Sequence, residues 1–180
     1  KESITANNFI IAKDKVAGIS DAELIMLAKA EAISTTDSAP VAITNVDKTQ
    51  LQAEEGTYDI TFSTAKGTSV SVKATVIDGV ISEDKENAIV ANNITITLTE
   101  AHTFTKTELL DEMWAKLYVG GSEVTDAIRK MILSATDYAS VKNAKTAGNV
   151  NISLTYGSGS GSVTKEVVVT ITDDGSSVSE

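Results

Sequence analysis

The stretch at residues 56–79 reads GTYDITFSTAKGTSVSVKATVIDG and decides the fold of the chain. Apolar side chains occupy every second position from Tyr58 to Phe62 and again from Val70 to Val76. This period of two residues is typical of strands that bury one face and leave the other in water. Gly67 stands in the break between the two runs and tolerates a positive φ, so the stretch predicts a β-hairpin.

The two halves of the chain carry the same landmarks at a constant distance. The motif Ala-Asn-Asn stands at residues 6–8 and, 85 residues later, at 91–93, each time before an apolar stretch. Ser20 with Glu23 and Thr105 with Glu108 are also separated by 85 residues. Two separate landmarks at one spacing indicate an internal repeat, and hence two copies of one module.

Each copy is also predicted to contain one amphipathic helix. The pairs Ser20–Glu23 and Thr105–Glu108 match the capping box with which many helices begin. We expect helices of roughly three or four turns after these boxes, with Trp114 packed in the core. The apolar residues at helical spacing are Leu24, Ile25, Leu27, Ala28 and Ala32 in the first copy, and Leu109, Leu110, Met113, Trp114 and Leu117 in the second.

The second copy is longer because of two insertions. Residues 150–154 match 58–62 at a spacing of 92, and the final strands, at 73–78 and 168–173, lie 95 residues apart. The three residues added within the hairpin fall at the Gly-Ser sequence 157–162, which predicts a flexible, longer turn. The seven others fall in residues 120–147, where 124–133 are expected to form a second helix. The first copy instead has a predicted strand, residues 41–46, after Pro40.

These patterns predict a mainly β fold with short helices, divided into two modules. Module 1 spans residues 1–80 and module 2 spans residues 87–175, with 81–86 as a linker and 176–180 as a tail. About 90 residues suffice for an independent core. Since the chain begins at Lys1 and ends in Ser-Ser-Val-Ser-Glu, we expect it to be part of a longer precursor.

The composition describes a folded, acidic chain. Hydrophobic residues make up 42% and charged residues 22% of the sequence, as in globular rather than disordered proteins. The formal net charge of −10, with Arg129 as the single arginine, argues against binding to nucleic acid or to anionic membranes. No apolar run approaches the roughly 18 residues that span a bilayer, so no membrane insertion is expected. The absence of cysteine excludes disulfides and thiolate chemistry.

Few residues suggest chemistry of their own. His102 is the single histidine and has no nucleophile motif to serve, so a surface role is favoured over catalysis. Carboxylates near the module ends are weak candidates for calcium, which prefers oxygen ligands in flexible loops. They are Asp78, Glu83, Asp84, Asp173 and Asp174. Their spacing matches no EF-hand loop, and a solvated acidic turn is the simpler interpretation.

Two further features leave alternatives open. Lys13, Lys73 and Lys165 lie near predicted strands, and Asn residues are common, so the ingredients of an intramolecular Lys–Asn amide bond are present. Exposed lysines on wet strand faces explain them equally well. Trp114 and Tyr118 suggest an aromatic platform for sugars, but Trp114 belongs to the apolar stripe of the predicted helix, which favours core packing.

Several segments together resemble a known family. Ala-Asn-Asn-Phe at 6–9, Ile-Ser-Asp-Ala-Glu-Leu at 19–24 and the hairpin at 56–78 resemble the tandem Ig-like repeats of cell-wall-anchored, adhesin-type surface proteins of Gram-positive bacteria. The resemblance covers all of module 1 and the start and end of module 2, but not its middle. It implies two tandem Ig-like β-sandwich modules, each with an inserted amphipathic helix, in an extracellular stalk. It implies no catalytic residues and no cofactor.

The leading hypothesis is a non-enzymatic stalk or adhesion module on a bacterial cell surface, which spaces or presents a binding region. It would be attached to the cell wall through segments outside this sequence. Its partners would be neighbouring repeats of the same chain and a host protein or glycan. One alternative is a carbohydrate- or host-protein-binding module in its own right, with residues 120–147 as the binding face. Another is an accessory domain of a secreted enzyme.

Overall fold

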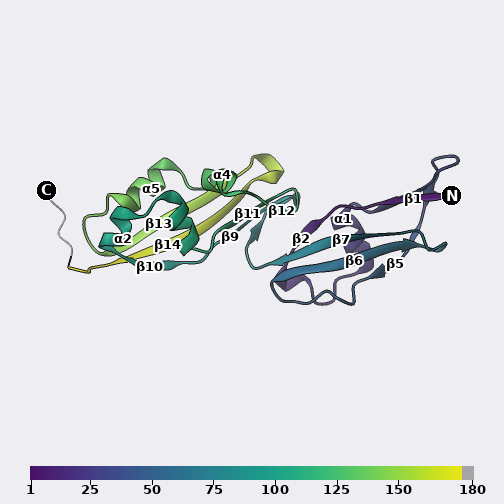
Figure 1. Ribbon diagram of the computed structural model, residues 1–180, viewed down its shortest axis with the longest axis horizontal. Helices are drawn as coiled ribbons and strands as arrows, with labels where there is room; N and C mark the ends of the chain where they lie inside the picture. Colours follow the sequence, from purple (N-terminus) through teal and green to yellow (C-terminus); the bar gives the residue numbers. More distant parts are fainter. Residues whose placement is uncertain (176–180) are drawn as a thin grey trace. The chain divides into compact units, whose positions relative to one another are not determined.

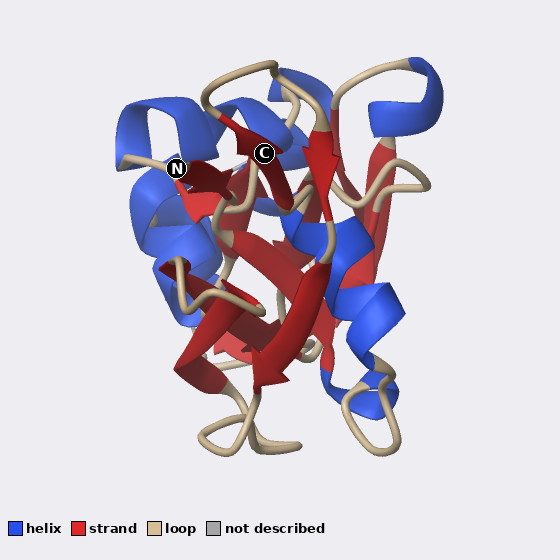
Figure 2. Cartoon of the chain, turned by 90° about the vertical axis from the view of Figure 1, so that its right-hand side faces the viewer, coloured by secondary structure: helices blue, strands red, loops and turns tan. Residues whose placement is uncertain are grey.

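The computed structural model describes residues 1–175, and the predicted tail at 176–180 lies outside the described residues. The backbone is mainly β, with 41% of residues in strands and 24% in helices, which confirms the predicted β-rich class. Figure 2 shows the strands in red and the helices in blue. The chain divides into two compact units: unit 1 comprises residues 1–78 with 120–122, and unit 2 comprises residues 79–119 with the chain from 123 onward.

Unit 1 contains two sheets and one α-helix, α1 (Figure 1). The first sheet has the order β1-β3-β4 and the second the order β2-β7-β6-β5. The predicted hairpin is confirmed, since β6 and β7 pair antiparallel from Gly56 opposite Val76 to Ser63 opposite Ser69. The elements are β1 (Glu2–Thr5), β2 (Phe9–Ala12), a 3₁₀ turn (Lys13–Lys15), α1 (Asp21–Ala28), β3 (Glu31–Ser34), β4 (Pro40–Val41), β5 (Ile43–Asp47), β6 (Gly56–Thr64) and β7 (Ser69–Ile77).

The core of unit 1 is formed by the alternating residues that the sequence pattern identified. Ile60, Phe62 and Ala74 are fully buried, and they pack with Leu24 and Ala28 of α1. Because a strand turns successive side chains to opposite faces, only one face of the β6–β7 hairpin joins this core. The strands β4 and β5 confirm the predicted strand after Pro40.

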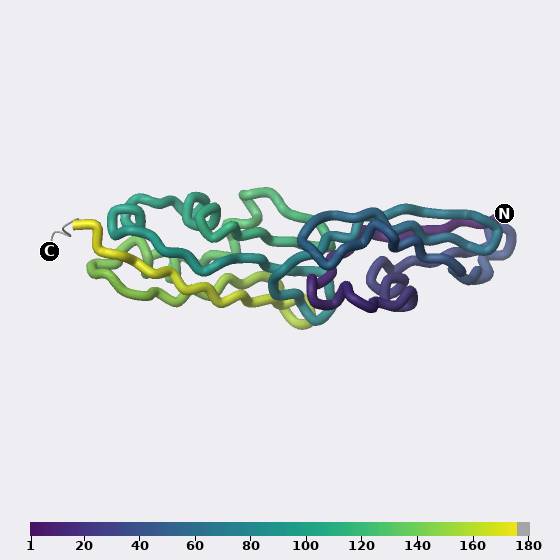
Figure 3. The backbone as a smooth tube through the Cα atoms, turned by 90° about the horizontal axis from the view of Figure 1, so that it is seen from below, coloured from purple at the N-terminus to yellow at the C-terminus, as the bar shows by residue number. Residues whose placement is uncertain are grey.

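Unit 2 also contains two sheets, of order β12-β11-β9-β8 and β10-β14-β13. Figure 3 shows its last two strands running side by side, β13 in light green and β14 in yellow. The elements are β8 (Val80–Ile81), β9 (Asn87–Val90), β10 (Ile94–Thr97), α2 (Leu98–Thr103), α3 (Lys106–Glu112), β11 (Lys116–Val119), β12 (Ser122–Glu123), α4 (Asp126–Arg129), a 3₁₀ turn (Lys130–Ile132), α5 (Ala135–Lys142), β13 (Gly148–Tyr156), a 3₁₀ turn (Gly159–Gly161) and β14 (Val163–Thr172).

The two units share the same strand pairings at the predicted spacing. In unit 1, β1 pairs antiparallel with β3 (Glu2 opposite Ser34), and in unit 2, β9 pairs antiparallel with β11 (Asn87 opposite Val119). An early strand then pairs parallel with the last strand of each unit, β2 with β7 and β10 with β14. The 85-residue spacing of the sequence is therefore a repeat of register as well as of composition.

The predicted helix starts are right and the predicted helix lengths are wrong. Ser20 accepts a hydrogen bond from the Glu23 amide at the start of α1, and Thr105 with Glu108 forms a complete capping box at α3. However, α1 has 8 residues and α3 has 7, about two turns each. The predicted apolar stripe does not continue to Leu117, because α3 ends at Glu112 and Leu117 lies in β11.

The segments predicted as a linker and as a flexible turn contact each other within unit 2. Ile81, the first residue of the predicted linker, belongs to β8, which pairs with β9. The Asp84 amide donates to the Ser160 carbonyl at 3.0 Å, and the Asn87 side-chain amide donates to the Gly161 carbonyl at 2.8 Å. The Gly-Ser sequence therefore forms a 3₁₀ turn held by hydrogen bonds rather than a freely moving loop.

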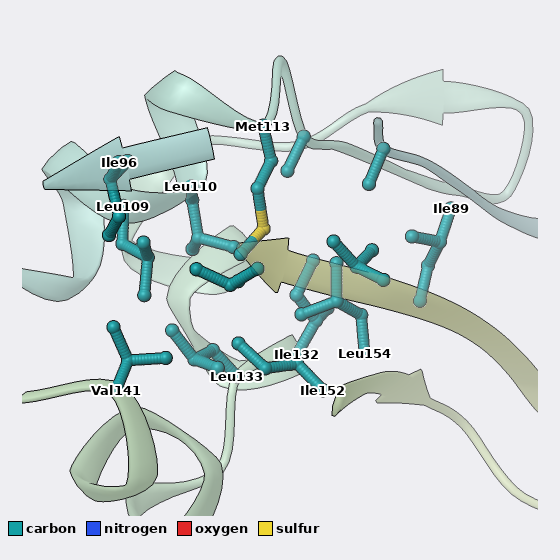
Figure 4. Close-up of a cluster of buried hydrophobic side chains, with 14 of the residues drawn as sticks. Ile89, Ile96, Leu109, Leu110, Met113, Ile132, Leu133, Val141, Ile152 and Leu154 are labelled. Carbon is teal, nitrogen blue, oxygen red and sulfur yellow. The ribbon is translucent and has the colours of Figure 1, made fainter. Parts of the chain in front are cut away.

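The insertion forms helices in place of the edge strand of unit 1. A single helix over 124–133 is not formed; α4 begins at Asp126, a 3₁₀ turn follows, and α5 begins at Ala135. In unit 1 the corresponding edge of the hairpin pairs with β5, whereas in unit 2 the Asp137 carboxylate on α5 accepts the Ser153 amide of β13 at 2.9 Å. Figure 4 shows Leu133 and Val141 of the insertion pointing into the core with Leu109 and Leu110. The insertion is thus part of the fold of unit 2.

Candidate functional site

The insertion in unit 2 is the predicted variable face, and Arg129 joins it to α3. The Arg129 side chain is 14% exposed, and its Nη2 lies 2.8 Å from the Asp111 carboxylate and 2.5 Å from that of Asp126. Its Nη1 donates to the Ala115 carbonyl at 3.1 Å. A planar guanidinium can make these several bonds at once, whereas a lysine ammonium cannot match their geometry. The one arginine of the sequence therefore anchors α4 to the end of α3.

The electrostatics of this network favour the charged forms. Burial lowers the pKa of the Arg129 guanidinium, but hydrogen bonds to Asp111 and Asp126 outweigh burial and raise it above its ordinary value. The Thr107 hydroxyl, which donates to Asp126 at 2.8 Å, holds the pKa of that carboxyl below its ordinary value, and Arg129 acts in the same direction. A permanently ionised pair of this kind suits a structural contact better than a proton transfer.

His102 contacts a backbone carbonyl in the same unit. Its Nε2 lies 2.6 Å from the Ala144 carbonyl, which follows α5, and the Lys142 ammonium donates to the His102 carbonyl at 3.3 Å. The side chain is half-buried between α2 and the end of α5. These contacts give the histidine a role in holding the two helices together.

Two more side chains fix the insertion to the rest of unit 2. The Tyr138 hydroxyl donates to the Phe104 carbonyl at 2.5 Å, and the Lys106 ammonium donates to the Leu133 carbonyl at 2.8 Å. Both bonds join the insertion to the chain around α3. The insertion therefore presents an ordered surface, which a binding face requires.

Trp114 is the clearest departure from the sequence prediction. Its side chain is 73% exposed, whereas Tyr118 is buried at 6% exposure, so the predicted core position of Trp114 is wrong. The residue has φ +52 and follows Met113, the C-cap of α3, and the Ala115 amide donates to the Leu110 carbonyl at 2.9 Å. This is the left-handed cap that ends many helices. The aromatic ring consequently points away from the stripe that Leu109 and Leu110 form.

The internal repeat contains a signal that Trp114 is exposed, although the helical periodicity of the sequence did not indicate it. Lys29 occupies the matching place after α1, with φ +51, and the Ala30 amide donates to the Ile25 carbonyl at 2.9 Å. Extending the 85-residue spacing past the capping boxes aligns Lys29 with Trp114. A lysine is a poor core residue, so this alignment predicts an exposed position in both units.

The calcium candidates have local hydrogen-bonding roles. The Asp84 carboxylate accepts the Ser82 hydroxyl at 2.6 Å and the Glu86 amide at 3.0 Å, as in a turn. Asp173 accepts the amide of Gly175 at 2.9 Å.

The other three calcium candidates are Asp78, Glu83 and Asp174. Asp174 accepts the amide of Thr99 at 3.2 Å, at the start of α2. Asp78 directly follows β7, and Glu83 lies in the turn between β8 and β9. Within residues 1–175, no group of three or more His, Asp or Glu side chains is placed to hold a metal ion. The structure does not assemble the candidates into one site among the described residues.

The lysines considered for an amide crosslink lie at the surface. Lys73 forms an ion pair with Asp59 across the β6–β7 hairpin, and the two side chains are 58% and 57% exposed. Lys13 is exposed and Lys165 is half-buried. Lys73 matches the alternative interpretation, a lysine on the wet face of a strand. Lys13 instead lies in the 3₁₀ turn after β2, and Lys165 lies opposite the buried Leu154, on the buried side of β14.

The repeated Ala-Asn-Asn motif has a physical role that the sequence did not reveal. The Asn8 side-chain oxygen accepts the Lys73 amide of β7 at 2.9 Å, and the Asn93 oxygen accepts the Val168 amide of β14 at 2.9 Å. In each unit the preceding asparagine donates its backbone amide to the end of a helix region, Asn7 to Ala28 and Asn92 to Met113, both at 2.8 Å. The motif thus fixes the chain just before the parallel strand begins.

Comparison with protein-family models and with curated proteins finds no match to this chain. In the part of the chain that the structure describes, no helix is both long enough and apolar enough to cross a lipid bilayer.

Proposed function

We propose that this chain is a non-enzymatic spacer or adhesion region of a bacterial surface protein, formed by two tandem Ig-like modules. The observation that carries the proposal is the repetition of one set of strand pairings, with the same register and the same asparagine contacts, in both units. A chain that repeats a whole folding unit gains length with each copy. That property is useful in a stalk.

The Ig-like assignment within this proposal is supported by the arrangement of the strands. Each unit has two sheets and one buried apolar cluster, as expected where sheets face each other across a core. The long hairpins are antiparallel, and an early strand pairs parallel with the last strand. The helices α1 and α3, which follow that early strand, are the elements inserted into the sandwich in this proposal.

The surface chemistry is consistent with a spacer. The net charge of −10 makes neighbouring copies repel each other, which disfavours collapse of a repeated chain onto itself. Arg129 and His102 contribute hydrogen bonds to carbonyl groups of the fold, so these two residues serve the structure of unit 2.

Small-angle X-ray scattering on tandem arrays tests the proposal. Arrays of one, two and four copies of this chain are expected to show a maximum dimension that grows in proportion to the number of copies. The cross-sectional radius of gyration is expected to stay constant, as in a rod. A maximum dimension that grows only as the cube root of mass would mean that the modules collapse into a globule, which contradicts a spacer.

A second candidate function is favoured by one observation, the exposure of Trp114. An exposed aromatic ring on an ordered surface can stack on a sugar ring or enter a pocket of a host protein. A glycan and extracellular-matrix array probed with the chain and with Trp114→Ala separates the two candidates. Saturable binding that the substitution abolishes would establish a binding module. Equal, background-level signals would count against it.

A further inference from the structure

The strand pairs β2–β7 and β10–β14 are parallel, and each contains the last strand of its unit. In unit 1, Phe9 lies opposite Ala74 and Ala12 opposite Ile77. In unit 2, Ile94 lies opposite Val169 and Thr97 opposite Thr172. The early strand and the last strand of a unit therefore run in the same direction, and the chain enters and leaves each pair at opposite ends.

This direction decides how a pulling force would act on the pair. A force on the N-terminal side of β2 pulls this strand backward, while a force on the C-terminal side of β7 pulls its partner forward. The two strands are then sheared, so the hydrogen bonds of the ladder share the load and must break together. If the force were applied at neighbouring ends, the same bonds would break one after another, at lower force.

The asparagine contacts lie where the load would enter. Asn8 directly precedes β2, and its side-chain oxygen accepts the Lys73 amide of β7, one residue before the ladder begins. Asn93 makes the same contact with Val168 of β14 before β10. Each contact extends the parallel ladder by one bond at its loaded end.

We propose that the two parallel pairs, with Asn8 and Asn93, are strand clamps that make each unit resist force applied between its ends. This inference rests on the proposed spacer function, because a stalk between a cell and its target carries tension. The inference also identifies which part of the fold bears the tension. The clamps are the Asn8–β2–β7 contact in unit 1 and the Asn93–β10–β14 contact in unit 2.

The direction of pulling provides the sharpest test, because it leaves every contact of the clamp in place. The chain has no cysteine, so pairs of introduced cysteines define the points of attachment. Lys1→Cys with Asp78→Cys shears the clamp of unit 1. Lys13→Cys with Asp78→Cys pulls at neighbouring ends of β2 and β7 and opens the ladder bond by bond. Residues 1, 13 and 78 are all exposed, so the handles do not disturb the core.

In single-molecule force spectroscopy we expect a clearly higher unfolding force for the 1–78 pair of handles than for the 13–78 pair. Equal forces, or a higher force with the 13–78 handles, would overturn the clamp. This result is independent of the scattering test of the arrays. A globular array with a direction-dependent unfolding force would reject the spacer and retain the clamp, and a rod-like array without that dependence would do the reverse.

A second experiment tests the asparagine contacts with the chain held by its two termini. Asn93→Ala removes one hydrogen bond and is expected to raise the unfolding rate of unit 2 at a fixed force about fivefold, because forced unfolding follows the unfolding barrier. The unfolding event of unit 1 should keep its rate. Asn8→Ala should raise the unfolding rate of unit 1 and leave that of unit 2 unchanged.

Matched controls remove an asparagine outside the clamps. Asn151 on β13 and Asn45 on β5 are exposed, and their replacement by Ala should leave both unfolding rates unchanged. Far-UV circular dichroism confirms that each variant is folded before it is pulled. Clamp and control variants with the same unfolding rates would overturn the role of the asparagines.

Discussion

At the scale of single residues, Trp114 shows how backbone and side chain can compete. A left-handed backbone conformation costs a non-glycine residue roughly 1–2 kcal/mol, yet this bulky residue adopts it with φ +52. Its ring remains 73% exposed, so burial returns little of that cost. Folding alone therefore gives no reason for tryptophan at this position. A contact with another molecule would give one.

Replacement of Trp114 by glycine tests this interpretation. Trp114→Gly should raise the free energy of unfolding of unit 2 by up to about 1 kcal/mol, because glycine adopts the left-handed cap without strain. Chemical denaturation followed by far-UV circular dichroism measures the change. Lys29→Gly, at the matching cap in unit 1, is the control and should behave alike. A marked loss of stability in Trp114→Gly alone would show that the ring packs against the fold.

Glu2 predicts a pH dependence for unit 1. The Thr64 hydroxyl, which donates to Glu2 at 2.6 Å, is the main cause that holds the pKa of this carboxyl below its ordinary value of 4.5. Because the pKa is lowered in the folded state, the contribution to stability is complete above 4.5 and is lost as the pH falls through the lower, folded value. The melting temperature of unit 1 should therefore fall in that acidic range.

Glu2→Gln is expected to flatten this part of the pH profile, since glutamine does not ionise. Glu55→Gln, at an exposed position before β6, is the control and should leave the profile as it is. Thermal melts over the acidic range provide the measurement. If Glu2→Gln and the unmodified chain lose stability in parallel, the Glu2–Thr64 contact contributes nothing to the acid sensitivity.

At the scale of elements, a strand or helix could be predicted where its sequence pattern is compatible with only one kind of secondary structure. Alternation over residues 58–62 and 70–76 fits only a strand, and the capping boxes fit only a helix start. The apolar residues from Leu109 to Leu117 fit two structures, because a short helix followed by a buried strand also places all of them except Trp114 in the core. Periodicity cannot separate these structures, and the left-handed cap at Trp114 decides between them.

The candidate site was less predictable than the fold, for a similar reason. Residues 120–147 were identified as the place where the copies differ, but the contacts of Arg129 reach Asp111 and Ala115, which precede that segment. Such contacts depend on the tertiary structure, and no short sequence pattern encodes them. The Gly-Ser turn was misjudged because composition alone says nothing of the carbonyls that accept bonds from Asp84 and Asn87.

The anchoring of α4 by Arg129 leads to a prediction at this scale. Arg129→Ala removes charge-assisted bonds to two carboxylates and one to a carbonyl, and should lower the free energy of unfolding of unit 2 by about 2 kcal/mol. Arg129→Lys should recover only part of this loss, because one ammonium cannot reach all three acceptors. Lys130→Ala, at an exposed neighbour, is the control. A change in Arg129→Ala no larger than that of the control would mean that the network is not stabilising.

At the scale of the whole molecule, strand pairing and buried apolar side chains account for the fold of both units without a bound metal ion. The acidic residues near the module ends accept backbone amides at Asp84, Asp173 and Asp174. Within residues 1–175, no three acidic or histidine side chains are placed to hold one cation. The melting temperature should therefore be the same with added calcium and with a chelator. A rise with calcium that the chelator reverses would establish a metal site at these residues.

A spacer separates the segments on either side of it, and display of the chain on a cell surface measures this separation. One, two and four copies of the chain are placed between a wall-attached anchor and a terminal epitope tag on a Gram-positive cell. Super-resolution imaging measures the height of the tag above the cell wall. We expect the height to increase by the same step with each added copy. A height that does not change with copy number would mean that the chain is not a spacer.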